Sequence, residues 1–233
     1  APLDGETAEV AGRRIHARML QGYGMSELSP VSHAMPAERT DIPVSSIGVI
    51  LPNIECKLVD TETGEEITEV GDDGATLPGE LWVKGPNVML GYLNQPEATA
   101  ETLDADGFLH TGDVAVFHEQ GYFSIVERVK ELIKYHGYQI APAELEALLL
   151  GHPKVMDVAV IGVLDDEKEE IPKAFVVAAP DSGLTEDEVK AYVAEHVAPY
   201  KKVRRVEFID AIPKSSSGKI LRKDLRAREA ARA

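Results

Sequence analysis

The sequence is poor in cysteine, and this limits how its fold can be stabilised. Cys56 is the only cysteine in 233 residues, so no disulfide can form within the chain. A structural zinc site is also disfavoured, because such sites usually need cysteine pairs. The length and an apolar content of 44% are ample for a hydrophobic core, in one large domain or two modest ones.

Long apolar runs are absent as well. No stretch reaches the roughly 20 apolar residues of a membrane-spanning helix, and no signal peptide opens the chain. We therefore expect a cytoplasmic protein with no membrane span. The first residues lack an initiator methionine and begin within a pattern, so we also expect the chain to start inside a longer polypeptide whose N-terminal half is missing.

Basic residues are scarce in the first part of the chain. Residues 1–127 carry 6 basic and 22 acidic side chains, whereas residues 128–233 carry 18 of each. This acidic body argues against nucleic acid as a partner, because the nucleic-acid backbone needs a basic surface. Residues 199–232 carry 11 basic and 4 acidic groups and could meet a smaller polyanion, although a solvated helix face is the usual interpretation.

Short β-rich runs separated by turns dominate residues 46–127. They are SIGVIL, IECKLVD, GELWVKG, NVMLGYL and GYFSIVER, with hairpin turns expected at DTETGEE and HEQGYF. ARMLQGYG, residues 17–24, is expected to be a strand, and NQPEATAET a single helix with Pro96 in its first turn. Residues 46–127 therefore predict a mostly antiparallel, barrel-like unit.

The pattern changes after Arg128. Helices are predicted at APAELEALLLGHP, TEDEVKAYVAEHV and GKILRKDLRAREAARA, and strands at VMDVAVIGV, KAFVVAAP and VRRVEFID. This alternation predicts a compact α+β module. The fold expected overall is thus mixed α/β and β, with a domain boundary near residues 128–130.

Several well-known site motifs are incomplete in this chain. SSSGKIL is not a phosphate loop, because Pro213 and Ile220 stand where glycine and a hydroxyl residue are needed. GMSEL is not a nucleophile elbow, because Leu28 replaces the second glycine. HTGD supplies His110 and Asp113 without a third ligand nearby, so this motif alone does not predict a metal site.

Four stretches stand out as a set: QGYGMSE (21–27), HTGD (110–113), residues 127–146 and residues 212–223. Each by itself has an ordinary interpretation as a turn, a strand end or a surface lysine. Their order and separation resemble the C-terminal portion of an adenylate-forming acyl-CoA synthetase of the AMP-binding superfamily, and especially the 4-coumarate–CoA ligase group. The resemblance covers essentially the whole chain, and RVKELIKYHGYQIAPAELE and PKSSSGKILRKDLR are its most specific parts.

The resemblance implies an ATP-dependent acid–CoA ligase with Mg²⁺. Such enzymes join a carboxylate to the α-phosphate of ATP, release pyrophosphate, and then exchange AMP for the CoA thiol. It implies 4-coumarate or a related hydroxycinnamate as substrate, with a medium-chain fatty acid as the alternative. It also implies that residues 1–127 end a large adenylate-binding domain, that 128–130 form a hinge, and that 131–233 form a small mobile lid domain.

The family binds AMP with the loop that corresponds to QGYGMSE. By resemblance, Tyr23 stacks on the adenine, while Gln21 and Gly22 line its edge. Ser26, where the family usually has threonine, keeps the hydroxyl that bonds the α-phosphate. Glu27 helps to hold Mg²⁺, a hard cation suited to carboxylate oxygen.

Other nucleotide and substrate contacts follow from the same resemblance. Asp113 accepts both ribose hydroxyls, which suits an acceptor-only carboxylate, and Arg128 is a second ribose contact. Lys130 is the hinge residue. Pro30 and Val31 match the far wall of the acyl pocket.

The remaining candidate residues lie in the predicted lid domain. Lys219 matches the lysine that reaches the α-phosphate and the substrate carboxylate, where it would stabilise negative charge. Lys134 and Gln139 match nucleotide contacts, and Gly137 matches the glycine beside which the pantetheine arm of CoA passes. Close relatives commonly have lysine where this chain has His136, which is assigned no role.

The family's loop that grips the β- and γ-phosphates does not occur in the chain, so we expect residues 1–233 alone to be inactive in adenylation. Alternatives within the same fold are a luciferase-like enzyme and a peptide-synthetase adenylation domain. An alternative of another class is a non-catalytic nucleotide-binding module. Glu27, Asp113 and Lys219 are all present, which favours an enzyme.

Overall fold

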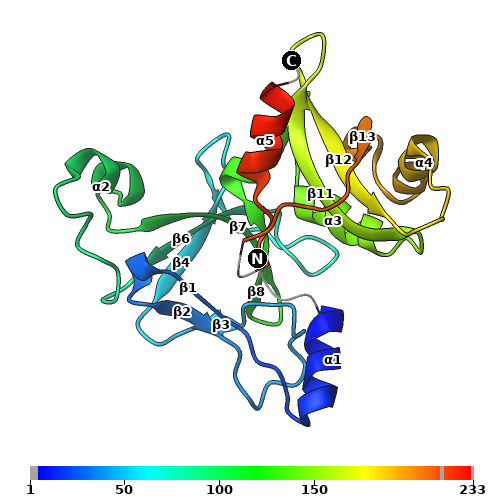
Figure 1. Ribbon diagram of the computed structural model, residues 1–233. Coiled ribbons are helices and arrows are strands. Elements are labelled where there is room, and N and C mark those ends of the chain that lie inside the picture. Colours follow the sequence, from blue (N-terminus) through cyan, green and yellow to red (C-terminus); the bar gives the residue numbers. More distant parts are fainter. Residues whose placement is uncertain (1–4, 216–217, 232–233) are drawn as a thin grey trace. The chain divides into compact units, whose positions relative to one another are not determined.

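The computed structural model describes residues 5–215 and 218–231. The chain divides into two compact units, Ala1–Val129 and Lys130–Ala233 (Figure 1). Both units combine helices with small sheets, so the fold is mixed α/β with several sheets. In the described part of the chain, no helix is long and apolar enough to cross a bilayer.

The first unit is built mainly from antiparallel strands. Its sheets have the strand orders β1-β2-β3 and β5-β4-β6-β7-β8. In chain order its elements are α1 (Gly5–Ile15), β1 (Gly22–Gly24), the 3-10 helix η1 (Ser26–Leu28), β2 (Val31–Ala34), β3 (Val49–Ile50), β4 (Glu55–Val59), β5 (Glu66–Ile67), β6 (Gly79–Lys84), α2 (Pro96–Thr102), β7 (Leu109–His118) and β8 (Tyr122–Arg128).

The barrel-like arrangement expected for residues 46–127 is not formed by the described strands. The larger sheet runs linearly from β5 to β8, and an isolated bridge between Gly48 and Phe123 links it to the chain beside β3. Two open sheets therefore stand in place of a closed ring. They share a core in which Leu28 of η1 packs with Leu81 and Val83 of β6, all fully buried.

Two expected strands of the first unit are wrong or too long. The run NVMLGYL contains no strand, because turns close on Gly85 and Tyr92 and Gly91 has a φ of +144°. Its side chains Leu90 and Leu93 are exposed. The strand expected at residues 17–24 is confined to β1. No element was expected for α1, and β7 was indicated only indirectly, by the hairpin turn expected at HEQGYF.

The second unit is a three-stranded sheet with helices on both faces, plus a short hairpin. In chain order its elements are the 3-10 helix η2 (Val129–Glu131, which spans the boundary), β9 (Ile133–Tyr135), β10 (Tyr138–Ile140), α3 (Pro142–Leu150), β11 (Val155–Leu164), β12 (Glu170–Ala178), α4 (Glu186–His196), the 3-10 helix η3 (Pro199–Lys201), β13 (Arg205–Phe208) and α5 (Arg222–Ala230). β11 and β12 are antiparallel, whereas β12 and β13 are parallel and connected through α4.

Alternating residues of the central strands make two separate cores. Val158 and Val160 of β11 face α3 and α4, whereas Ala159 and Ile161 face the side where α5 contributes Leu225. This is the period-two pattern of a strand that is buried on both faces. The α+β module predicted after Arg128 therefore has the expected strands and helices.

The helix boundaries were predicted well, with one exception. Pro142 begins α3 and Gly151 follows its end, and Thr185 caps α4 by accepting a hydrogen bond from the Glu188 amide at 3.2 Å. The last helix, expected from residue 218, begins instead at Arg222. Ile220 pairs with Lys214 in an isolated bridge, so Ile220 does not join the helix.

Candidate functional site

The QGYGMSE loop of the first unit is closed tightly on itself. β1 pairs antiparallel with β2, so that Tyr23 lies opposite His33. At Gly24, a Cβ atom would lie 1.9 Å from the carbonyl oxygen of Pro30, which only glycine can avoid. The buried Leu28 then anchors the end of the loop in the core, so the loop presents its remaining side chains from a fixed base.

Three of the sequence-predicted site residues are linked directly. The Tyr23 hydroxyl donates to Oδ2 of Asp113 at 2.6 Å, across 90 residues of sequence. Arg128 Nε lies 2.9 Å from Oδ1 of the same carboxylate, which is mostly buried. Asp113 and Arg128 are directly paired residues of β7 and β8, so the strand register produces this ion pair.

The electrostatics of this group keep Tyr23 a hydrogen-bond donor. Burial raises the pKa of Tyr23 far above its usual value, and the neighbouring Asp113 carboxylate raises it further. Each carboxylate oxygen can accept two hydrogen bonds, so Asp113 retains acceptor capacity beside Tyr23 and Arg128. A pair of hydroxyl groups, such as those of a ribose, is the kind of donor that this capacity suits.

A second loop supports Glu27, and sequence reasoning missed it. The Tyr92 hydroxyl donates to Oε1 of Glu27 at 2.8 Å, and the Met89 amide donates to the Glu27 carbonyl oxygen at 2.8 Å. Asn87 Nδ2 donates to the carbonyl oxygens of Leu28 and, at 3.0 Å, Val31. The Gly-Tyr pair after Met89 was the available signal, but it lies in the run interpreted as a strand.

The other candidates of this loop lie at the surface. Gly22, Ser26, Pro30 and Val31 are exposed. Gln21 is half-buried, and its side-chain amide donates to the Val44 carbonyl oxygen. The exposed residues are therefore open to a ligand from solution.

Glu27 is a suitable but solitary carboxylate for a metal ion. In the described residues, no three His, Cys, Asp or Glu side chains form a group that could hold a metal. Mg²⁺ is commonly held by one or two carboxylates together with water and the phosphates of a substrate, so one carboxylate is enough. The hydrogen bond from Tyr92 would orient the Glu27 carboxylate that holds such a cation.

In the second unit, three candidates share one hairpin. Lys134 of β9 lies directly opposite Gln139 of β10, and His136 and Gly137 form the turn with φ values of 48° and 79°. Two successive positive φ values are typical of the tight turns that fit twisted hairpins. The tip is exposed, and a Cβ atom on Gly137 would meet no atom within 4 Å, so the space beside Gly137 is open.

Lys219 lies on another hairpin of the second unit. The Ser215 amide donates to the Lys219 carbonyl oxygen at 2.8 Å, and the Lys219 amide donates to Ser215 Oγ at 3.2 Å. The Lys219 side chain is exposed. Lys130, the expected hinge residue, is exposed within η2, where the second unit begins.

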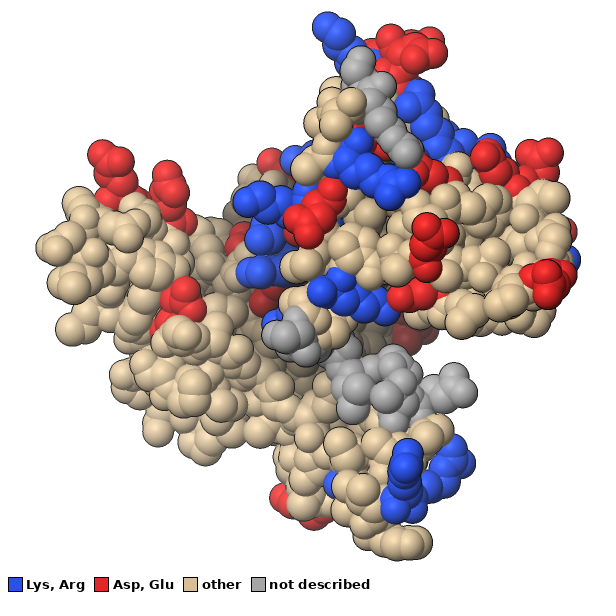
Figure 2. All heavy atoms as spheres, viewed as in Figure 1, with Lys and Arg blue, Asp and Glu red and all other residues tan. Residues whose placement is uncertain are grey.

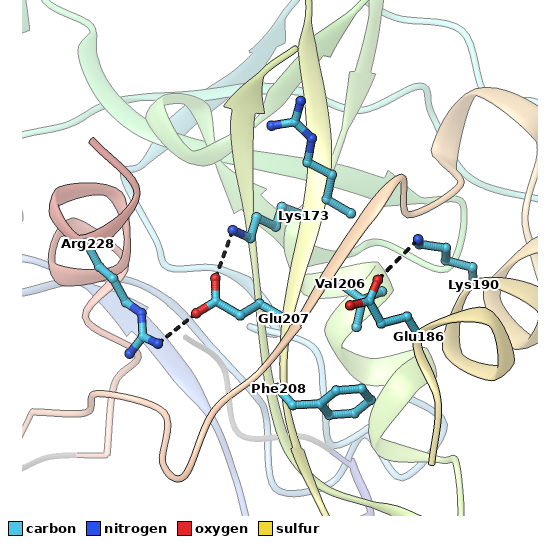
Figure 3. Close-up of a pocket in the computed structure, with 8 residues that line it drawn as sticks. Lys173, Glu186, Lys190, Val206, Glu207, Phe208 and Arg228 are labelled. Carbon is cyan, nitrogen blue, oxygen red and sulfur yellow. Dashed lines mark hydrogen bonds and ion pairs between the residues drawn. The ribbon is translucent and has the colours of Figure 1, made fainter. Parts of the chain in front are cut away.

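A polar hollow of about 460 Å³ in the second unit contains none of these candidates (Figure 3). Most of its charges are paired with one another: Glu207 binds Lys173 at 2.9 Å and Arg228 at 2.7 Å, and Glu186 binds Lys190 at 3.5 Å. The remaining cation, Arg205, lies 3.9 Å from Asp166, which is outside the hollow. Because its cations already have carboxylate partners, the hollow is part of the ionic framework of the unit.

Two family models match the chain in succession. The model described as "AMP-binding enzyme" matches residues 1–93, and the model described as "AMP-binding enzyme C-terminal domain" matches residues 144–219. The chain is 47% identical to 4-coumarate–CoA ligase 5 of Oryza sativa subsp. japonica, over 99% of this chain and 42% of the relative. It is 50% identical to 4-coumarate–CoA ligase 2 of Narcissus pseudonarcissus, over 99% of this chain and 40% of the relative.

A solved structure gives the same comparison in three dimensions. The ATP-bound MatB from Rhodopseudomonas palustris superposes with a TM-score of 0.86 at 32% identity, over 98% of this chain and 44% of MatB. The chain thus spans about two fifths of the length of the curated relatives that it matches.

Proposed function

The chain belongs to the AMP-binding enzymes, and from this premise we propose that the protein carrying it is an ATP-dependent acid–CoA ligase. The Tyr23–Asp113–Arg128 group carries the proposal, because it joins residues of three separate sequence motifs in one hydrogen-bonded group, whose carboxylate suits the ribose of a nucleotide. The names of the relatives that are 47–50% identical support the same reaction class. The first unit would hold the nucleotide and the second unit would supply residues for each step.

The nucleotide would be held chiefly by the first unit. Asp113 would accept hydrogen bonds from the ribose hydroxyls, with Arg128 beside it, and Tyr23 would stack on the adenine. Ser26 would donate its hydroxyl to the α-phosphate from its exposed position at the start of η1. Glu27 would hold Mg²⁺, which neutralises phosphate charge when bound.

In the first step, the substrate carboxylate oxygen attacks the α-phosphorus of ATP. A bond forms between these two atoms, and the bond to the β-phosphate oxygen breaks, so pyrophosphate leaves. Lys219 would stabilise the negative charge where carboxylate and phosphate meet, a contribution that can reach roughly 3–4 kcal/mol per positioned donor. Lys134 and Gln139 would contact the nucleotide from their hairpin.

In the second step, the CoA sulfur attacks the acyl carbon. The thiol proton is lost, the thioester bond forms, and AMP leaves with the oxygen that came from the carboxylate. The pantetheine arm would pass the open space at Gly137. We propose that Lys130 is the pivot that lets residues 131–233 serve the two steps in turn, as a lid on the adenylate-binding part that residues 1–127 complete.

The substrate proposed is 4-coumarate or a related hydroxycinnamate. The support is the name of the relatives, 4-coumarate–CoA ligase, together with the small to medium side chains at Pro30 and Val31. A medium-chain fatty acid is the second candidate, since these side chains do not exclude it. A panel of acids scored by kcat/KM on the complete protein decides between them, and preference for octanoate over 4-coumarate would overturn the choice.

ATP–pyrophosphate exchange tests the reaction class. The complete protein should exchange labelled pyrophosphate into ATP when its acid is present, whereas residues 1–233 alone should not. If the complete protein binds ATP without any exchange across the acid panel, the non-catalytic nucleotide-binding alternative replaces the ligase. Exchange by residues 1–233 alone would refute the assignment of the phosphate-gripping loop to an upstream segment.

A further inference from the structure

Lys219 is an exposed side chain on a short hairpin, and the reaction proposed above needs it at a defined place. An ammonium group at the end of a flexible side chain is useful only if its backbone is fixed. The hairpin's own backbone bonds join its two arms to each other, through Ser215 and Lys219 and through the Leu221 amide, which donates to the Pro213 carbonyl oxygen at 2.8 Å. These bonds do not attach the hairpin to the rest of the unit.

The hairpin is attached to the unit by apolar packing and by ion pairs. Ile220 packs against the core that contains Ile212 and Leu225, and each arm also carries one ion pair. On the first arm, Lys214 Nζ lies 2.7 Å from Oδ2 of Asp157 on β11. On the second arm, Arg222 donates to Oε2 of Glu146 on α3 at 2.7 Å. Arg222 is three residues beyond Lys219 and is also the first residue of α5. Both arms are thus held against the α3–β11 part of the second unit.

The second attachment is the more buried of the two. The Glu146 and Arg222 side chains are only 10% and 15% exposed, whereas those of Asp157 and Lys214 are 28% and 38% exposed. Glu146 Oε1 also accepts the Val160 amide at 2.8 Å, and Arg222 Nε donates to the Val160 carbonyl oxygen at 3.4 Å. The ion pair is therefore hydrogen-bonded to both the amide and the carbonyl of Val160. These bonds fix the orientation of the Arg222 side chain as well as its distance from β11.

Apolar packing of α5 itself contributes little to holding the helix against the sheet. Leu225 is the only buried side chain of the helix. Its other anchors are charged: Arg226 pairs with Glu131, Arg228 with Glu207, and Glu229 with Lys173. Figure 2 shows basic and acidic side chains interspersed over this part of the surface. The basic run read from the sequence is thus largely engaged within its own unit.

We propose that Glu146 and Arg222 are positioning residues for Lys219: their buried ion pair sets the place from which Lys219 acts in adenylation. This inference rests on the proposed function for the role of Lys219, but not for the attachment itself. The AELE and ILRK segments are among the parts of the sequence that most specifically resemble the family, and this inference assigns them a role. Neither residue needs to touch the substrates.

The test separates positioning from stability by removing both charges together. Replacing a buried ion pair by apolar side chains of similar size is often neutral for stability, whereas removing one partner leaves a buried charge. In the complete protein, the double variant Glu146→Met/Arg222→Met should therefore melt only moderately below wild type, because no charge is left unpaired and only the Val160 amide and carbonyl lose a partner. Its adenylation rate, measured by pyrophosphate exchange, should nevertheless fall by about 10- to 100-fold, because small misplacements of a reacting group have effects of this size. The reaction of supplied acyl-adenylate with CoA should change less than threefold.

Glu229→Gln is the matched control, because Glu229 lies on the same helix in another ion pair but ten residues from Lys219, whereas Arg222 is three residues away. It should leave exchange within about twofold of wild type. A second readout uses residues 1–233 and does not depend on activity: amide hydrogen exchange at Lys219–Leu221 should be faster in the double variant and unchanged in Glu229→Gln. Should the double variant melt well below wild type, Glu146→Gln, which keeps an acceptor for the Val160 amide, takes its place with the same expected losses.

The outcomes separate the two proposals. If wild type shows no exchange of pyrophosphate, the proposed function fails, while amide exchange still tests the attachment. If wild type is active and Lys219→Ala is not, but the double variant adenylates like wild type, the positioning inference is overturned. Equal losses in the double variant and in Glu229→Gln would also overturn it, because they would show a general requirement for α5 docking.

Discussion

Mild acid should destabilise the first unit, because this unit buries a neutral imidazole. His33 is fully buried, with its ring edge-on to Tyr23 and Phe123. Burial lowers the pKa of His33 from 6.5 to about 4. Below pH 6.5 the unfolded chain therefore binds a proton that the folded unit binds only near pH 4. The stability contributed by the neutral imidazole is complete above pH 6.5 and is lost as the pH falls from 6.5 to about 4.

The size of the effect follows from the two pKa values. A pKa lowered from 6.5 to about 4 makes the unit about 3 kcal/mol less stable once both states are protonated, and about 2 kcal/mol less stable at pH 5 than at pH 7.5. His118, whose pKa burial also lowers, adds to the loss in the same direction. The carboxylate of Asp41, with a pKa lowered to about 2, acts only at more acid pH.

Urea unfolding followed by tryptophan fluorescence measures this loss in the first unit alone. Trp82 is the only tryptophan of the chain and lies in β6. His110 stacks on it with the ring centroids 3.6 Å apart, and the urea midpoints rather than the fluorescence intensities are compared. Wild type, His33→Phe and His118→Gln are each unfolded at pH 7.5 and pH 5.0.

His33→Phe should keep an aromatic ring against Tyr23 and remove most of the pH dependence, whatever it does to the stability at pH 7.5. His118→Gln should remove only the share of His118. The reasoning is refuted if His33→Phe loses as much stability between pH 7.5 and pH 5.0 as wild type does, because the buried imidazole would then not be the group that titrates.

Three further outcomes can be measured. Lys219→Ala in the complete protein should slow acyl-adenylate formation by at least about 100-fold and leave the CoA reaction of supplied adenylate largely intact; equal slowing of both steps would contradict its assigned role. Tyr92→Phe removes the hydrogen bond to Glu27 and should raise the Mg²⁺ concentration for half-maximal adenylation about fivefold, so an unchanged Mg²⁺ requirement argues against metal binding there. Gly24→Ala puts a methyl group against the Pro30 carbonyl and should destabilise the first unit by about 1–3 kcal/mol, which the Trp82 midpoint in urea reports; a neutral result would mean that the loop is loose.

Regular elements were predictable because their signals are local. The alternation around Leu81 and Val83 identifies β6, and Pro142 and Gly151 mark the two ends of α3. Thr185 predicts the start of α4, because its capping hydrogen bond reaches a residue only three positions away. In each case the residues that decide the structure are neighbours in sequence.

The site could be predicted only as a set of residues, not as contacts. The bond between Tyr23 and Asp113 joins residues 90 positions apart, and no local pattern contains it. The hydrogen bond from Tyr92 to Glu27 was missed for a further reason. The apolar residues around Gly91 have the pattern of a strand, but the structure has turns there, and Leu90 and Leu93 are exposed. The candidate roles came from resemblance to a family, whereas the register of β7 and β8 supplied the geometry that places Asp113 beside Arg128.

The ion pairs of α5 also determine when the second unit can be completed during synthesis. Glu146 leaves the ribosome 76 residues before Arg222. At about 5–20 residues per second, its charge waits roughly 4–15 seconds for this partner. Burying Glu146 earlier would leave an unpaired charge in the unit, so the second unit should stay open to chaperones and proteases until α5 emerges.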